Sequence, residues 1–140
     1  MQHEISCSWK SDLVFEGHVQ GKSVIIDGGK GEGHEVQGPS PKRLLLLSVA
    51  GCTAMDVISI ARKARIEVED FTVRVVGDLS EDHPRVYTHI KIIYEFRGKD
   101  LEASRDKIIN AINLSQDKYC GVSAMIRKAA PIEWELVLSS

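Results

Sequence analysis

A dense apolar block at residues 44–60 constrains the fold more than any other part of this sequence. It opens with four leucines, Leu44 to Leu47, and its main polar interruptions are Ser48, Thr53 and Asp56. A helix over this block has almost no polar face in its first half, so that half should be enclosed on nearly all sides. A chain of 140 residues has little material to enclose it. The pattern therefore predicts a buried helix covered in part by a partner subunit.

Local signals place this helix and two others. The apolar helix should begin at Ser40-Pro41 and run to about Arg65, because serine can cap the first free amides and proline loses no hydrogen bond at the first helical position. An amphipathic helix is expected from Leu101 to about Lys118. A third, short helix should begin near Cys120-Gly121 and end before Pro131.

Strand patterns flank these helices. Alternating residues from Ile5 to Phe15, followed by Gly21-Lys22 and Ser23–Ile26, predict two or three antiparallel strands. A long hairpin is expected from residues 71–78 and 86–96, and residues 132–138 should form a last strand. The order of elements indicates an α+β fold in a single domain, residues 1–140.

Composition excludes several classes of function. The net charge is −2 and the charged residues are scattered, so nothing favours binding to nucleic acid or to anionic lipid. Residues 1–10 lack a basic region followed by an apolar stretch, which predicts a soluble, cytoplasmic protein that is not exported. The glycine-rich run Gly28–Gly33 predicts a mobile loop; it lacks the arrangement of a phosphate-binding loop, so no nucleotide is expected.

Three cysteines, Cys7, Cys52 and Cys120, are widely spaced along the chain. They show neither CxxC nor Cys/His ligand spacing, which argues against a secreted disulfide framework and against a zinc site. No metal and no cofactor is therefore expected. In a reducing cytosol, any pairing among these cysteines should be transient and chemical.

The position of each cysteine allows a structural and a chemical interpretation. Cys52 lies within the apolar helix beside Gly51, where it could be a small core residue or a thiol that a ligand can approach. Cys120 lies at the expected start of a short helix, where free amides favour a thiolate, although a buried cap would serve as well. Cys7 is expected to be structural.

Two of these neighbourhoods resemble a known family. The residues that carry the resemblance are Gly38-Pro39-Ser40-Pro41, the leucine run, the Ala50–Asp56 segment (Ala-Gly-Cys-Thr-Ala-Met-Asp) and Tyr119–Ser123 (Tyr-Cys-Gly-Val-Ser). Together they resemble the superfamily of osmotically inducible protein C and organic hydroperoxide resistance proteins (OsmC/Ohr), over about Val24 to Trp134. The resemblance implies an OsmC-like fold with antiparallel sheets around central, buried, cysteine-bearing helices. It also implies an intertwined homodimer with active sites at the interface.

The resemblance further implies a thiol-dependent peroxidase for oxidative stress defence. The thiolate of Cys52 would attack an organic hydroperoxide and become a sulfenic acid, and Cys120 would condense with it to a disulfide. An external dithiol, a lipoyl group or a small thiol would then reduce the bridge. The apolar side chains Leu45, Val49 and Met55 would suit an organic hydroperoxide, or they simply pack.

The sequence departs from the family at the residues that activate the peroxidatic cysteine. The family places a glutamate just after the proline that starts the helix, and here that position is Lys42. The family's N-terminal arginine is also missing, since no arginine occurs before Arg43. Lys42 of the same helix is about 15 Å from Cys52, at 1.5 Å per residue. Lys42 of a second subunit, Lys22 and Lys30 are the other candidates.

Acidic and imidazole side chains offer further candidates. Asp56 is one turn after Cys52 and would raise the pKa of its thiol if unpaired; it could also cap a neighbouring element or pair with Arg62. His18 and His34 could titrate near neutral pH and assist proton transfer.

Two other functions remain open from the sequence. The missing arginine and glutamate would fit a non-catalytic dimer that binds a small apolar ligand, such as a lipid or an acyl group. The cysteine pair would also fit a thiol redox sensor that is oxidised once without turnover.

Overall fold

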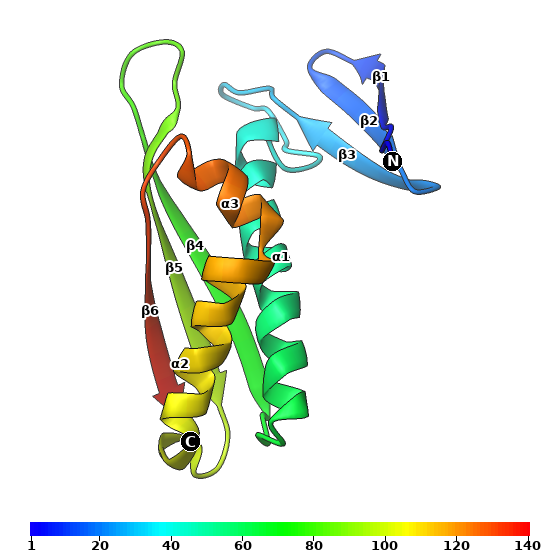
Figure 1. Cartoon of the computed structure of the whole chain (residues 1–140). Coiled ribbons are helices and arrows are strands. Elements are labelled where there is room, and N and C mark those ends of the chain that lie inside the picture. Colours follow the sequence, from blue (N-terminus) through cyan, green and yellow to red (C-terminus); the bar gives the residue numbers. More distant parts are fainter. The chain divides into compact units, whose positions relative to one another are not determined.

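The computed structural model describes every residue from Met1 to Ser140. The chain forms two compact units, Met1–Leu45 and Leu46–Ser140. Helices and strands both contribute to the fold (Figure 1), so the expected α+β class is confirmed.

The first unit contains a three-stranded antiparallel sheet in the order β1 (Ser6–Ser11), β2 (Val14–Val19) and β3 (Lys22–Asp27). Gln20 and Gly21 connect β2 to β3, and both have positive φ values, of 51° and 72°. Positive φ at both central residues is the geometry of the two-residue turns that match the twist of a hairpin. The predicted N-terminal strands are therefore confirmed.

The glycine-rich run after β3 has no regular secondary structure and is anchored on the buried carboxylate of Asp27. One carboxylate oxygen accepts a hydrogen bond from the Gly29 amide at 2.8 Å. The other contacts the Gln37 amide at 3.1 Å and Nε2 of His34 at 2.9 Å. The loop predicted from the glycines is confirmed, and Asp27 provides an anchor that the sequence pattern did not reveal.

The second unit is built on a sheet in the order β4 (Asp70–Leu79), β5 (Tyr87–Arg97) and β6 (Ile132–Ser139). β4 and β5 form the predicted antiparallel hairpin, whereas β5 and β6 run parallel. The expected antiparallel pairing is therefore confirmed for β4 and β5, whereas β6 departs from it. The reason is the connection: the chain between β5 and β6 folds into helices that return it to the starting end of the sheet, as parallel pairing requires.

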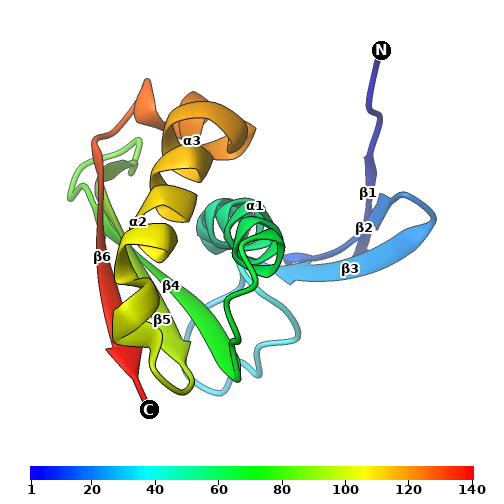
Figure 2. The same cartoon turned by 60° about the horizontal axis from the view of Figure 1, so that its bottom comes forward.

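Four helical segments and the part of α1 (Pro41–Lys63) from Leu46 onward complete the second unit. The four are η1 (Leu101–Ser104), α2 (Arg105–Leu114), η2 (Ser115–Tyr119) and α3 (Gly121–Arg127). The single helix expected from Leu101 to Lys118 is thus divided into a 3-10 turn, an α-helix and a π-helical turn. In both views of the molecule, α1 and α2 lie over the same face of the sheet (Figure 2).

α1 begins at the predicted proline and ends two residues before the predicted end. Arg65 adopts a left-handed conformation with φ 59°, and the amide of Ile66 bonds back to the carbonyl of Ala61. This pattern is a common way for a helix to end.

The core lies between the sheet and its helices. Side chains of β4 and β6 alternate between this core and solvent, whereas β5, the central strand, is the most buried. The fully or almost fully buried hydrophobic residues come from α1, β5 and α2, and they are Val49, Val57, Ala61, Ile90, Ile92, Tyr94, Phe96, Ile108, Ala111 and Ile112. The outer face of the sheet carries ion pairs such as Lys91–Glu135, at 3.1 Å.

The apolar block of α1 is not enclosed within one chain. Leu47 is 62% exposed and Met55 is 72% exposed, whereas Val49 and Thr53 are fully buried. By length and composition alone α1 could cross a membrane. However, Thr53 bonds to Tyr94 of β5, which is the position of a core helix rather than of a lipid-facing one. The exposed apolar side chains of α1 are consistent with the partner subunit predicted from the sequence.

We expect Asp27→Ala to lower the midpoint of urea unfolding at neutral pH, because it leaves two backbone amides without their acceptor. Hydrogen bonds from the Gln37 and Gly29 amides hold the pKa of Asp27 below its ordinary value. The stabilisation should therefore be complete above the unfolded pKa of about 3.9 and be lost as the pH falls through the lower folded pKa. Glu35→Ala, at an exposed carboxylate in the same loop, is the control. Equal midpoints for the two variants at pH 7 would contradict this role of Asp27.

Candidate active site

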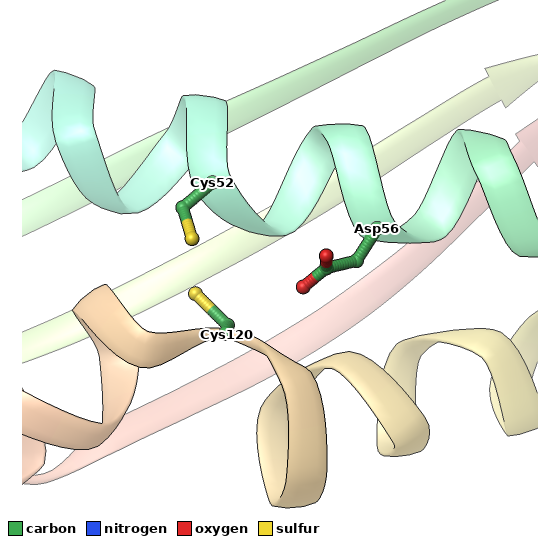
Figure 3. Close-up of side chains that lie close together, drawn as sticks. All are labelled: Cys52, Asp56 and Cys120. Carbon is green, nitrogen blue, oxygen red and sulfur yellow. The ribbon is translucent and has the colours of Figure 1, made fainter. Parts of the chain in front are cut away.

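The fold brings Cys52, Asp56 and Cys120 together. Cys52 and Asp56 lie one turn apart on α1, and Cys120 lies opposite them at the junction of η2 and α3 (Figure 3). The two sulfur atoms and a carboxylate oxygen of Asp56 all lie within 4.8 Å of one another. Both cysteines are free thiols, and their sulfur atoms point toward each other.

Cys120 is the N-terminal cap of α3, as its sequence position predicted. Its backbone is extended, with φ −77° and ψ 95°, and its sulfur accepts a hydrogen bond from the Ser123 amide at 3.3 Å. The Ser123 hydroxyl lies 3.2 Å from the same sulfur. The side chain is buried, with 2% of the residue exposed. Cys120 is therefore held in one place by two contacts to one neighbour.

Cys52 is half-buried and is the more accessible of the two thiols. Burial raises the pKa of the Cys52 thiol, and the hydrogen bond and charge of Cys120 and the charge of Asp56 raise it further. A hydrogen bond from the Val122 backbone acts in the opposite direction. The surroundings thus favour a neutral thiol at Cys52.

Asp56 contacts η2 rather than a cation. Its carboxylate accepts a hydrogen bond from the Ser115 hydroxyl at 2.9 Å. Of the two alternatives, a neighbouring element or a cation such as Arg62, the side chain contacts the neighbouring element η2. Ser115 lies 59 positions further along the chain, so no local sequence pattern indicated this hydrogen bond.

A buried network of hydroxyls and one amide lies beneath the cysteines. Thr53 Oγ1 is 2.7 Å from the Tyr94 hydroxyl and 2.8 Å from the Ser115 hydroxyl. Gln116 donates to Thr53 at 3.1 Å and to Ser123 at 3.2 Å. Burial raises the pKa of Tyr94 to about 12, so its hydroxyl stays protonated at neutral pH. Every buried side-chain polar atom has a partner.

Arg127 fixes the orientation of Gln116, a role that the sequence did not suggest. Its guanidinium donates to the Gln116 side-chain oxygen at 2.9 Å and to the Gln116 carbonyl at 3.2 Å. With the amide oxygen held by Arg127, the amide nitrogen must face the network and Ser123. A chain of contacts therefore runs from a cation through Gln116 and Ser123 to the sulfur of Cys120.

The other candidates from the sequence lie elsewhere in the two units. Val49 is in the core and Met55 is exposed on α1. His34 pairs with Asp27, and Cys7 is exposed on β1. The remaining candidates, Lys22, Lys30, Lys42 and His18, are exposed residues of the first unit.

A family model described as OsmC-like protein matches residues 30–135 of this chain. The chain belongs to the OsmC-like protein family. Protein YhfA of Escherichia coli K12 is 35% identical over 125 residues, which cover 89% of each chain.

Solved OsmC-like structures show the same fold. A hypothetical protein from Aquifex aeolicus superposes with a TM-score of 0.82 at 29% identity, covering 100% of this chain and 99% of the other. The organic hydroperoxide resistance protein OhrB of Bacillus subtilis has a TM-score of 0.67 at 17% identity, covering 97% and 98%. Membership of the OsmC/Ohr superfamily, inferred above from the two cysteine neighbourhoods, is thereby confirmed.

We expect Asp56→Asn to lower the pKa of Cys52, because it removes a negative charge and keeps an oxygen that can accept from Ser115. The measurement is the pH dependence of iodoacetamide alkylation, in a Cys7→Ser background so that the exposed thiol does not contribute. Alkylation at pH 7 should be several-fold faster than in the parent. Asp117→Asn, at an exposed carboxylate of η2, is the matched control. An unchanged or higher pKa in Asp56→Asn would contradict the electrostatic role of Asp56.

Proposed function

We propose that this protein is a cytoplasmic, thiol-dependent peroxidase that reduces organic hydroperoxides in defence against oxidative stress, with Cys52 as the nucleophile and Cys120 as the resolving thiol. The observation that carries the proposal is the approach of two free thiols within 4.8 Å in a member of this family. A disulfide needs a sulfur–sulfur distance of about 2.05 Å, so only a modest closing movement separates the two thiols from a bridge.

The reaction would proceed in three balanced steps. The Cys52 thiolate attacks the terminal oxygen of the hydroperoxide, so an S–O bond forms as the O–O bond breaks. Cys52 becomes a sulfenic acid, and the alkoxide leaves and takes up a proton to give an alcohol. The Cys120 thiol then attacks the sulfenic sulfur of Cys52, forming the disulfide and releasing water. An external dithiol such as a dihydrolipoyl group, or two molecules of a small thiol, finally reduces the bridge by exchange and is oxidised to a disulfide.

Exposure supports this division of roles. Cys52 is partly exposed, so a hydroperoxide can reach it, whereas Cys120 is buried behind it and bonded to Ser123. The buried thiol is suited to trap a sulfenic acid beside it before a second peroxide reacts.

The raised pKa of Cys52 sets the pH dependence of the first step. Only the thiolate attacks, so the rate should grow with pH and still be rising at about pH 9. The missing arginine and glutamate fit this electrostatic picture, because the charges that act on Cys52 come from Cys120 and Asp56 and both raise its pKa.

A homodimer is part of the proposal. The exposed apolar side of α1, which includes Leu47 and Met55, needs a cover, and a second copy of the chain is the simplest one. Such a cover would also give the site an apolar wall suited to an alkyl or aryl hydroperoxide.

The central experiment is stopped-flow oxidation of the reduced protein by cumene hydroperoxide and by hydrogen peroxide. Cumene hydroperoxide should react faster, and peptide mapping should find a bridge between Cys52 and Cys120. Cys52→Ser should abolish oxidation, whereas Cys120→Ser should give one trappable sulfenic acid and no turnover. Cys7→Ser is the control and should behave as the parent does.

Slow oxidation of the parent protein, with no bridge, would contradict the peroxidase proposal. A co-purified acyl or lipid species in native mass spectrometry would then support the ligand-binding dimer. The raised pKa of Cys52, which favours the neutral thiol, is consistent with that alternative. Fast formation of the bridge with no dithiol able to reduce it would instead indicate a redox sensor.

The dimer has its own test. We expect Leu47→Glu to shift the protein from dimer to monomer in size-exclusion chromatography with light scattering, because a charge would have to be buried at the contact. Val76→Glu changes an apolar residue of β4 that is 48% exposed on the other face of the sheet, and should leave the dimer intact. The opposite pattern would place the contact on the sheet instead of on α1.

A further inference from the structure

We propose that Cys52, Asp56 and Cys120 form, in the reduced protein, a binding site for a thiophilic divalent cation, with zinc as the reference ion. The three ligand atoms lie within 4.8 Å of one another. The sequence concealed the site, because its third ligand comes from a distant segment and only the fold assembles the group (Figure 3).

The geometry is close to that of a bound zinc ion. Bonds of about 2.3 Å to sulfur and 2.0–2.2 Å to oxygen put tetrahedral ligands about 3.5–3.8 Å apart. From separations of up to 4.8 Å, the three atoms would therefore have to close by about 1.3 Å at most. Rotation of the Cys52 and Asp56 side chains on α1 can provide this movement without a change in the backbone.

The types and spacing of the ligands also fit. Two thiolates and a carboxylate form a set that zinc accepts, and three protein ligands leave a fourth position open. Cys52 and Asp56 are four residues apart on one helix, the spacing with which helices commonly present two zinc ligands on one face. Cys120 faces them from a second segment.

Contacts around the three residues support this role. The Ser115 hydroxyl holds one carboxylate oxygen of Asp56 at 2.9 Å and leaves the other available. The sulfur of Cys120 accepts the Ser123 amide, and that of Cys52 accepts a backbone hydrogen bond from Val122. Outer contacts of this kind orient metal ligands and stabilise their charged forms.

The negative charge of the three side chains also favours a divalent cation. With both thiols deprotonated by the metal, the three groups carry three negative charges, and the charged groups that act on Cys52 are Cys120 and Asp56 themselves. The guanidinium of Arg127 is directed at Gln116 instead. A divalent cation would neutralise most of this charge.

Metal binding and oxidation would exclude each other. Zinc displaces one proton from each thiol and forms two Zn–S bonds, with no change in oxidation state. A hydroperoxide takes two electrons from the two thiolates, which become the disulfide, while two protons complete an alcohol and a water and the zinc ion is released. Zinc should therefore slow oxidation, and peroxide should discharge bound zinc.

The test is titration of the reduced full-length protein with zinc against a chromophoric chelator. One zinc per chain is expected. Cys52→Ser and Cys120→Ser should each weaken binding by at least about 100-fold and Asp56→Asn by about 10-fold, since a lost ligand should cost at least as much as a lost outer contact. Cys7→Ser is the matched control, and its affinity should equal that of the parent.

Cobalt provides a second readout on the unmodified protein, which decides the question even if a cysteine variant does not fold. Charge-transfer absorption from two thiolates and strong visible bands of tetrahedral cobalt are expected. Their absence, or zinc binding that persists after conversion to the Cys52–Cys120 disulfide, would overturn the proposal.

Peroxide consumption is measured separately, in chelator-treated protein. Zinc binding without peroxidase activity would support the metal site and contradict the proposed function. Peroxidase activity with no zinc binding would support the proposed function and contradict the metal site.

Discussion

The hydrogen bonds of Thr53 determine how the cysteine-bearing segments of this protein meet. Its hydroxyl is fully buried on α1 and contacts Tyr94 of β5 and both Ser115 and Gln116 of η2. Leaving one buried polar group unpaired costs about 1–3 kcal/mol, and a slip of α1 against η2 would unpair several at once. One register between the helix and the turn is therefore strongly favoured. Cys52 precedes Thr53 directly, so the same hydrogen bonds that satisfy the core also hold the two sulfurs face to face.

The local features of this fold could be predicted from adjacent residues, and the family resemblance predicted that Cys52 and Cys120 would meet, whereas the hydrogen bonds around the two thiols could not be predicted. Ser40-Pro41 marks the start of α1, and the cap at Cys120 marks the start of α3, because turn and cap preferences depend on a few adjacent residues. The hydrogen bond between Ser115 and Asp56 spans 59 positions and depends on a π-helical turn that interrupts an otherwise regular helical pattern. The clamp of Arg127 on Gln116 depends on the same turn. The parallel placement of β6 was missed for a related reason, since strand direction is set by the path of the intervening helices.

The electrostatic character of the cluster links its two proposed uses. Peroxide chemistry needs a thiolate at Cys52, yet burial and the neighbouring negative charges favour the neutral thiol. The group that compensates the negative charge of Asp56 and the thiolates would therefore determine whether the site binds a cation or reacts with a peroxide. A cation bound between the thiols would hold both as thiolates but occupy their electron pairs. A positive group brought by a second subunit would instead free Cys52 for attack. The absence of the family's arginine therefore leaves the site open to more than one kind of occupant.

The parallel pairing of β5 with β6 has a consequence for how the protein is made. β6 is the last strand of the chain, and its residues pair with β5 only after the whole helical connection has been synthesised. Until then the central strand of the sheet has one unpaired edge, and an unpaired edge is a template for association with other chains. A nascent or truncated chain that stops before Ile132 would already contain Cys52 and Cys120. It would nevertheless lack the strand that closes the sheet, so an unpaired edge of β5 and both thiols of the site would be present together before synthesis is complete.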